Sequence, residues 1–129
     1  MSGLAGGDAL FGGAGADTMT GGDGADVFFY LVAEDSPAGF FTRDVVIAFS
    51  HAQGDVIDLR QVDAIAATSG NDAFEFLGRD GFVDTAGQVE YTFAGGNTVV
   101  RVNTGGDLAP EMEIQLQGNI DLVAADFVL

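Results

Sequence analysis

Cysteine is absent from this chain of 129 residues, and so is lysine. Without cysteine there is no disulfide, and thiolate chemistry is excluded. Histidine occurs once, at His51, so the H-E-x-x-H pattern of zinc peptidases is missing. Without lysine, a glycine-rich phosphate loop is excluded as well. A carboxylate pair for glycoside hydrolysis is not excluded by composition, but most of the acids fit turn, ligand or surface positions.

Positive charge is scarce and negative charge is abundant. The cations are Arg43, Arg60, Arg79 and Arg101, against twenty acids, for a net charge of -16. A field of that sign repels nucleic acid and anionic lipid, so neither is an expected partner, and it attracts hard cations. No apolar run approaches the roughly 18 residues of a membrane span. Hydrophobic residues still make up 47% of the chain, enough for one modest core.

Three consecutive nonapeptides open the chain, at residues 3–11, 12–20 and 21–29. The second and third fit G-G-x-G-x-D-x-U-x, where U is a large apolar residue, and the first keeps the register with Leu4 in place of the second glycine. This pattern is the calcium-binding repeat of RTX proteins. A flexible linker has no reason to keep an aspartate and an apolar residue in phase over three repeats, so we expect a folded, calcium-binding segment.

Each position in the repeat has a physical role. The glycines allow a tight six-residue turn, the aspartate adds a carboxylate to the converging carbonyls, and the last three residues form a short strand. One turn has too few oxygens for Ca²⁺, which takes about six to eight, so the ion must lie between two stacked turns. The ligands predicted from the repeats are oxygens of Gly3, Ala5, Gly6, Asp8, Gly12, Ala14, Gly15, Asp17, Gly21, Asp23, Gly24 and Asp26.

Two nonapeptides form one full coil of the β-roll that this repeat implies. The turn of residues 3–8 should then stack on that of residues 21–26 and share an ion through Asp8 and Asp26. The turn ending at Asp17 lies on the opposite side of the roll, and its partner is either upstream sequence or the segment after Tyr30. Asp35, Asp44 and Asp55 are further candidate ligands where the roll meets the rest of the chain.

Beyond Tyr30 the sequence changes to short runs rich in Val, Ile and Phe, separated by polar turns. These predict strands at residues 44–49, 56–59, 73–77, 89–93, 98–103 and 111–116. Short helices are predicted at residues 61–67 and at 122–126, the latter with Asp121 as N-cap. Turns are predicted at residues 69–72, 95–97 and 105–107. We therefore divide one continuous structural domain into repeats at 1–33 and a β-rich part at 34–129.

Residues 3–129 resemble the C-terminal domain of serralysin-type secreted metalloproteases. Beyond the repeats, residues 44–49 are similar to the family's D-x-I-x-D-F, with Ala48 in place of its second acid, and residues 54–59 to its G-x-D-x-I-D-L. The last eight residues resemble the family's uncleaved signal for an ABC-type (type I) exporter. The resemblance implies an all-β fold: a short parallel β-roll followed by a mainly antiparallel, sandwich-like part.

Together these observations predict a calcium-binding RTX module of a larger exported protein, folding on Ca²⁺ after type I secretion. The expected cofactor is Ca²⁺, the expected location extracellular, and the expected state a monomer without catalytic residues of its own. The alternative is a Ca²⁺-dependent module that binds a polysaccharide or a surface for a secreted enzyme or adhesin. A third hypothesis, cryptic hydrolase activity, has no support in the residue inventory.

Overall fold

The computed structural model describes residues 1–65, 73–81 and 86–129. Its regular structure is almost entirely β, apart from two single 3₁₀ turns, η1 (Ala33–Asp35) and η2 (Ala124–Asp126). The strands are β1 (Ala9–Leu10), β2 (Thr18–Thr20), β3 (Val27–Phe29), β4 (Asp44–Ile47), β5 (Val56–Asp58), β6 (Glu75–Phe76), β7 (Gln88–Ala94), β8 (Asn97–Asn103), β9 (Met112–Leu116) and β10 (Phe127–Val128). Within these ranges no helix is long and apolar enough to cross a membrane.

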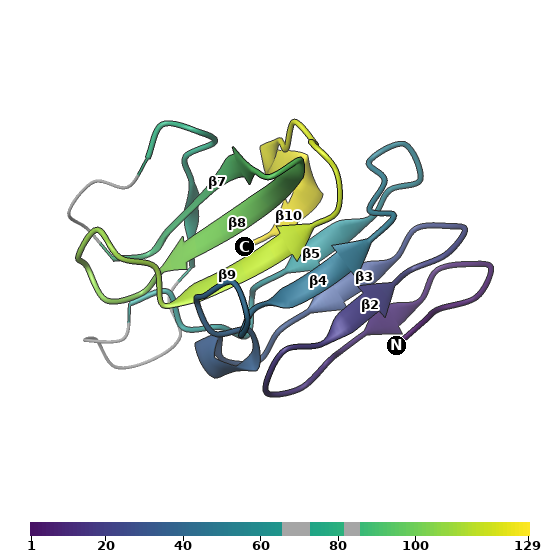
Figure 1. The fold of residues 1–129 in the computed structure, drawn as a ribbon, viewed down its shortest axis with the longest axis horizontal. Coiled ribbons are helices and arrows are strands. Elements are labelled where there is room, and N and C mark those ends of the chain that lie inside the picture. The colour runs from purple at the N-terminus through teal and green to yellow at the C-terminus, as the bar shows by residue number, and fades with distance from the viewer. Residues whose placement is uncertain (66–72, 82–85) are drawn as a thin grey trace.

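The strands form two sheets, in the orders β1-β3-β5-β10 and β2-β4-β9-β8-β7-β6. Successive repeats alternate between the sheets, which makes a parallel β-roll (Figure 1). The roll continues beyond residue 33, because β4 pairs in parallel with β2, and β5 with β3. In the second sheet β7, β8 and β9 are antiparallel neighbours. The predicted fold class, a parallel roll followed by a mainly antiparallel part, is confirmed.

The nine-residue spacing of large apolar residues builds the core of the roll. Leu10, Met19 and Phe28 are 2%, 0% and 0% exposed. In the first sheet Leu10 pairs with Phe28, and Phe28 pairs with Ile57 of β5, so the apolar column passes from the repeats into the later strands. Burying one such side chain contributes about 1.5 to 3 kcal/mol, so this column joins the repeats to the rest of the chain.

Two predicted helices are wrong. In the described part of the first, residues 61–65, the chain forms a turn: the Val62 amide bonds the Leu59 carbonyl at 3.0 Å, and Asp63 Oδ1 accepts from the Ile65 amide. That side-chain bond competes with a helical backbone pattern. The second helix is only the 3₁₀ turn η2, closed by Asp126 Oδ2 accepting from the Val123 amide, rather than a helix capped by Asp121.

Two strands are shorter than predicted, and one of the two predicted turns named here lies in the described part of the chain. β6 is shorter than predicted, covering Glu75–Phe76, and β4 ends at Ile47. The turn expected at residues 95–97 is present between β7 and β8. The turn expected at residues 69–72 lies outside the described residues, as do the last two residues of the helix expected at 61–67.

Ala48 ends β4 in a left-handed conformation with φ of 63°, the one positive φ at a non-glycine residue in the described ranges. A residue with a Cβ is strained there by about 1 to 2 kcal/mol, and replacing it with glycine would relieve this strain. Part of the resulting gain in stability is lost, because glycine increases the conformational entropy of the unfolded chain. We expect Ala48→Gly to raise the free energy of unfolding by about 0.5 kcal/mol, measured by urea denaturation in saturating calcium. Ala52→Gly, at an exposed turn residue without positive φ, should not stabilise; equal gains from both variants would contradict the strain argument.

Candidate metal centre

The turns of the first and third repeats lie directly against each other, as the repeat spacing predicts. Ala5 bridges Asp23 in parallel, and the Gly6 amide donates to the Asp23 carbonyl at 2.7 Å. At the end of the turn the Asp8 amide donates to Asp26 Oδ1 at 2.9 Å. The two aspartates therefore stand on successive levels of one stack, with their turn carbonyls beside them.

Glycine makes this close approach possible. Gly24 has φ of 119°, and a Cβ on it would lie 2.5 Å from the Gly6 carbonyl oxygen of the stacked turn. At Gly21, the first position of the repeat, a Cβ would collide with the Asp26 carboxylate of the same turn. The first glycine thus makes room for the aspartate, and the glycine at the fourth position makes room for the neighbouring turn.

The aspartate stack continues past the repeats. The Asp26 amide donates to Asp55 Oδ1 at 3.0 Å, and Asp55 Oδ2 accepts from the Ser50 amide. Asp8 Oδ2 likewise accepts from Leu4 of its own turn. We name Asp8, Asp26 and Asp55 the first aspartate ladder: in each step one carboxylate oxygen receives the amide of the aspartate one level away.

A second aspartate ladder lies on the other side of the roll. The Asp17 amide donates to Asp44 Oδ1 at 2.8 Å, and β2 pairs with β4 immediately after these residues. Of the two partners that the sequence left open for the Asp17 turn, the structure brings in the segment after Tyr30. Asp35 joins neither ladder; it closes its own turn by accepting from the amides of Leu31 and Val32.

Two carboxylate oxygens in these ladders are buried without a hydrogen-bond partner: Asp26 Oδ2 and Asp44 Oδ2. The Tyr30 hydroxyl is the third such side-chain atom among the described residues. Burial raises the pKa of Asp44 from 3.8 to about 6, against the opposing effects of the Asp17 amide and of the nearby Tyr30 hydroxyl, whose geometry falls short of a hydrogen bond. Burial and the nearby Asp44 charge also raise the pKa of Tyr30 well above its ordinary value. Buried carboxylate oxygens without donors are costly, and a bound cation would remove that cost.

Side chains alone do not form a metal site. In the described ranges no group of three or more His, Cys, Asp or Glu side chains lies close enough together to hold an ion. A cation at either ladder would therefore need backbone carbonyls as well as carboxylates, which is the donor set that Ca²⁺ accepts. At the first ladder such a carbonyl is close by: a Cβ on Gly3 would collide both with the Gly21 carbonyl oxygen of the stacked turn and with Asp8 Oδ2.

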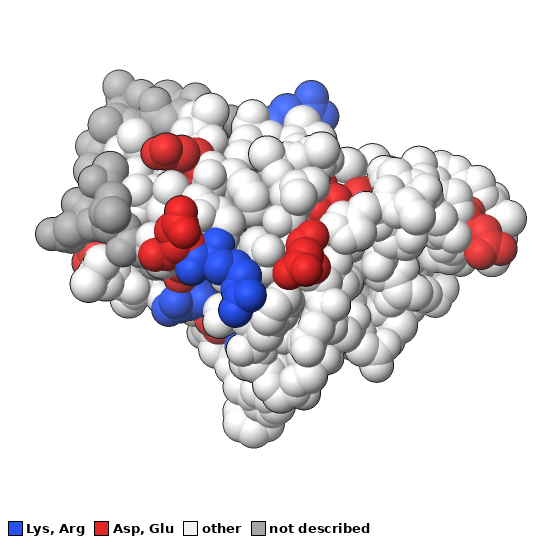
Figure 2. All heavy atoms as spheres, turned by 90° about the horizontal axis from the view of Figure 1, so that it is seen from above, with Lys and Arg blue, Asp and Glu red and all other residues white. Residues whose placement is uncertain are grey.

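Three of the arginines form ion pairs with carboxylates. Arg43 lies 3.3 Å from Glu113, Arg60 2.7 Å from Asp58, and Arg101 2.6 Å from Glu90. Arg79 instead lies over the ring of Phe93. Figure 2 shows blue and red side chains next to one another on the face viewed there. The glycine turns themselves contain aspartates and no arginine, so the negative charge around the ladders has no built-in cation from those turns.

One contact was missed by sequence reasoning. His51, the single histidine, lies in an exposed turn and places Nδ1 at 2.8 Å from both carboxylate oxygens of Asp126. The signal for Asp126 was present: like Asp8, Asp26 and Asp55, it directly precedes a strand of the first sheet. Its partner could not be read from the sequence, since the two residues are 75 positions apart.

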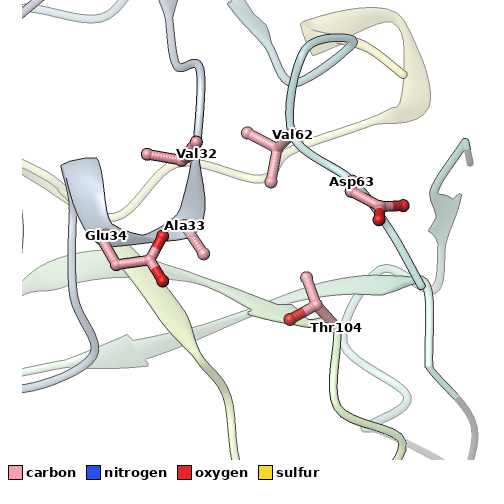
Figure 3. A pocket seen from close by; sticks show the side chains of 6 residues that line it. All are labelled: Val32, Ala33, Glu34, Val62, Asp63 and Thr104. Atoms are coloured by element: carbon pink, nitrogen blue, oxygen red, sulfur yellow. The ribbon is translucent and has the colours of Figure 1, made fainter. Parts of the chain in front are cut away.

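None of the predicted calcium ligands lines the pocket shown in Figure 3. It has a volume of about 170 Å³ and is lined by Val32, Ala33, Glu34, Val62, Asp63 and Thr104. Its two carboxylates come from separate segments: Glu34 belongs to η1, before β4, and Asp63 lies in the loop after β5. The pocket has no part in the metal centre.

Stacked glycine turns that connect the parallel strands of two sheets define a β-roll module of the RTX type. Residues 7–129 match the family model "Peptidase M10 serralysin C terminal". The chain belongs to this family, which is the non-catalytic C-terminal module of the peptidase.

Solved structures with a similar fold include two subunits of the mannuronan C5-epimerase of Azotobacter vinelandii. The AlgE6R3 subunit is 26% identical with a TM-score of 0.63, and the match covers 98% of this chain and 65% of that one. The AlgE6R2 subunit is 26% identical with a TM-score of 0.62, covering 95% and 71%. The chain thus spans about two thirds of these subunits. No curated protein sequence is similar enough to count as a relative.

Proposed function

We propose that this chain is a calcium-binding RTX module of a larger exported protein, which folds when it binds Ca²⁺ outside the cell. The observation that carries the proposal is the pair of buried, unpartnered carboxylate oxygens, Asp26 Oδ2 and Asp44 Oδ2, one on each aspartate ladder. Asp26 lies in the stack of glycine turns, and Asp44 lies at the start of β4 beside the Asp17 turn. These turns offer only oxygen donors, in a chain with a net charge of -16. Such a site fits a hard divalent cation better than any soft or nitrogen-preferring metal.

The two ladders divide the predicted ligands into two groups. At the first, Asp8 and Asp26 would act with turn carbonyls and with Asp55 on the next level; at the second, Asp17 would act with Asp44 and the carbonyls of its own turn. The carbonyl donors are those of Gly3, Ala5, Gly6, Gly21, Asp23 and Gly24 for the first and Gly12, Ala14 and Gly15 for the second. Asp35 is a weaker candidate, because it joins neither ladder and its Oδ2 already accepts from two amides of its own turn. A bound ion would supply positive charge between the stacked carboxylates.

Calcium binding would then drive folding. The self-repulsion of the acidic turns opposes stacking, so a chain without calcium stays loose and can be exported. Extracellular calcium modules bind at roughly 10⁻⁴ to 10⁻³ M, which leaves such sites empty in the cytosol and filled outside. Metal-binding free energy becomes folding free energy in such a domain. An ABC-type exporter is the proposed partner, through residues 122–129.

Isothermal titration calorimetry of chelator-treated protein tests the proposal. We expect saturable heats for CaCl₂ in the range of roughly 10⁻⁴ to 10⁻³ M and none for MgCl₂, which is smaller and demands a stricter geometry. Equal binding of both ions, or of neither, would contradict calcium as the cofactor. Calcium binding should be accompanied by a gain of β structure over the same range of calcium concentration, so circular dichroism is recorded on the same samples.

The raised pKa of Asp44 predicts how calcium binding depends on pH. Between about pH 4 and 6 the metal-free fold holds a proton on Asp44 that the unfolded chain has released, so its stability falls as the pH rises through that window. In the folded module calcium competes with that proton, so the calcium affinity of the fold should weaken as the pH is lowered through about 6. The calcium concentration needed for half-folding refers to the unfolded chain, in which Asp44 keeps its ordinary pKa of 3.8, and should rise only as the pH approaches that value. Asp44→Asn should need more calcium at pH 7 and show a flatter pH dependence, whereas Asp121→Asn should behave as the wild type. Identical pH profiles for the wild type and Asp44→Asn would exclude Asp44 from the site.

A second candidate function is binding of an anionic polysaccharide through calcium. It is favoured by the similarity to subunits of a mannuronan C5-epimerase. Co-sedimentation with mannuronan, in calcium and in chelator, tests it. Retention that requires calcium and survives about 0.5 M salt would support this function. At that salt concentration non-specific attraction between exposed charges is screened within a few ångströms. No retention in either buffer would leave calcium-dependent folding as the function of the module.

A further inference from the structure

The last strand of the chain lies in a site that exists only in the folded roll. β10 pairs in parallel with β5, with Phe127 opposite Ile57, and the Leu59 amide donates to the Val128 carbonyl at 2.9 Å. Phe127 is 7% exposed, and its ring centroid lies 5.0 Å from that of Phe76 (Figure 1 shows β10 beside β5). The receptor edge is therefore β5 itself, together with an aromatic contact from the second sheet.

β5 in turn depends on the first aspartate ladder. It is paired with β3 along its whole length, and the Asp26 amide bonds Asp55 just before β5 begins. A three-residue strand has no stability on its own, so the edge that receives β10 forms only after the turns have stacked. Docking of β10 is therefore the last step in a series that begins with the repeats.

The contact that holds β10 differs from the ladder steps before it. Asp126 precedes β10 as Asp26 precedes β3, but the register is shifted by one residue, since Phe127 rather than Val128 faces Ile57, and no ladder bond to Asp55 is formed. Its carboxylate, 4% exposed, is instead satisfied by His51 Nδ1 and by the Val123 amide. His51 belongs to the loop between β4 and β5, so it ties the final strand to the loop that leads into its receptor.

We propose that the pair His51–Asp126 is a latch that closes the export segment, residues 122–129, onto the folded roll. This rests on the proposed function, in which that segment is what the exporter binds. In the unfolded, calcium-free chain the segment is free; in the folded chain its backbone is paired and Phe127 is buried. Folding and recognition by the exporter are then mutually exclusive, and a module that has folded outside the cell cannot be bound again through this segment.

Digestion with a carboxypeptidase, followed by mass spectrometry, tests the latch. In saturating calcium the release of Leu129, Val128 and Phe127 should be slow, and His51→Ala should accelerate it about tenfold, since loss of a charge-assisted hydrogen bond permits local opening. Asp126→Asn should act in the same direction. Gln53→Ala, at an exposed residue of the same loop, is the matched control and should digest as the wild type does.

Circular dichroism and the calcium midpoint, measured on the same samples, separate the outcomes. Faster digestion of His51→Ala with an unchanged spectrum and midpoint supports the latch. Equal rates of digestion for the wild type and His51→Ala overturn it. The latch is also overturned if calcium changes the spectrum of the wild type but the wild type is digested equally fast in calcium and in chelator. If calcium changes neither spectrum nor digestion, the proposed function itself fails. If His51→Ala no longer folds, Asp126→Asn and a His51→Gln variant, which keeps a hydrogen-bond donor and should restore slow digestion, decide the question.

Discussion

Asp26→Asn should raise the calcium concentration needed for half-folding by about 100-fold or more. Asp26 is the middle of the first aspartate ladder: its amide donates to Asp55, its Oδ1 accepts from Asp8, and its Oδ2 is buried without a partner. Asparagine keeps the size of the side chain but removes the charge that faces the proposed ion, and its amide group would be buried against oxygens. The measurement is a calcium titration followed by far-UV circular dichroism.

The control is Asp23→Asn, which makes the same change of charge three residues away. Asp23 is exposed and takes part in the stack through its carbonyl, which accepts from the Gly6 amide. Its midpoint should stay close to that of the wild type. Equal shifts for the two variants would mean that overall charge, and not a ligand at Asp26, sets the response to calcium.

Gly24→Ala should cost about 1 to 3 kcal/mol more than Gly6→Ala. Both glycines occupy the fourth position of a repeat and have positive φ, 119° and 107°, so alanine is strained at each by about 1 to 2 kcal/mol. The surroundings differ: a Cβ at Gly24 would meet the backbone of Gly6 in the stacked turn, at 2.5 Å from its carbonyl oxygen, whereas a Cβ at Gly6 has nothing within 4 Å. Overpacking against backbone adds about 1 to 3 kcal/mol and pushes apart the carbonyls beside the ladder.

Urea denaturation in saturating calcium gives both free energies of unfolding, and the difference between them measures the stacking of the two turns. A loss at Gly24 no larger than that at Gly6 would show that the turns are not in contact in solution. Where Gly24→Ala does not fold at all, the calcium midpoint of Gly6→Ala still reports on the strain that both substitutions share.

The roll could be predicted from the sequence because each repeat contains the residues that determine its own turn and strand. The phase of Asp8, Asp17 and Asp26 fixes which turns share a side, and the phase of Leu10, Met19 and Phe28 fixes which residues face the core. Glycine at positions that need positive φ or close approach makes that reading specific. These local rules predict the stacking of the first and third turns without any long-range information.

The rest of the candidate site depends on pairings that the sequence does not encode locally. Asp44 reaches Asp17 across a loop of residues 31–43 with no repeat length to count, and His51 reaches Asp126 over 75 positions. The predicted helix at residues 61–67 had apolar residues at suitable spacing, but Asp63 bonds its own backbone there and Val62 and Ala64 are buried in a turn. The unpartnered oxygens of Asp26 and Asp44 appear only once the chain is folded.

The central claim is that calcium folds this module, and far-UV circular dichroism during a calcium titration of chelator-treated protein tests it most directly. The account predicts a cooperative gain of β signal at roughly 10⁻⁴ to 10⁻³ M Ca²⁺, with no such gain in Mg²⁺. A spectrum that is already β-rich in chelator and does not change with calcium would contradict it, because the aspartate ladders would then stack without a cation.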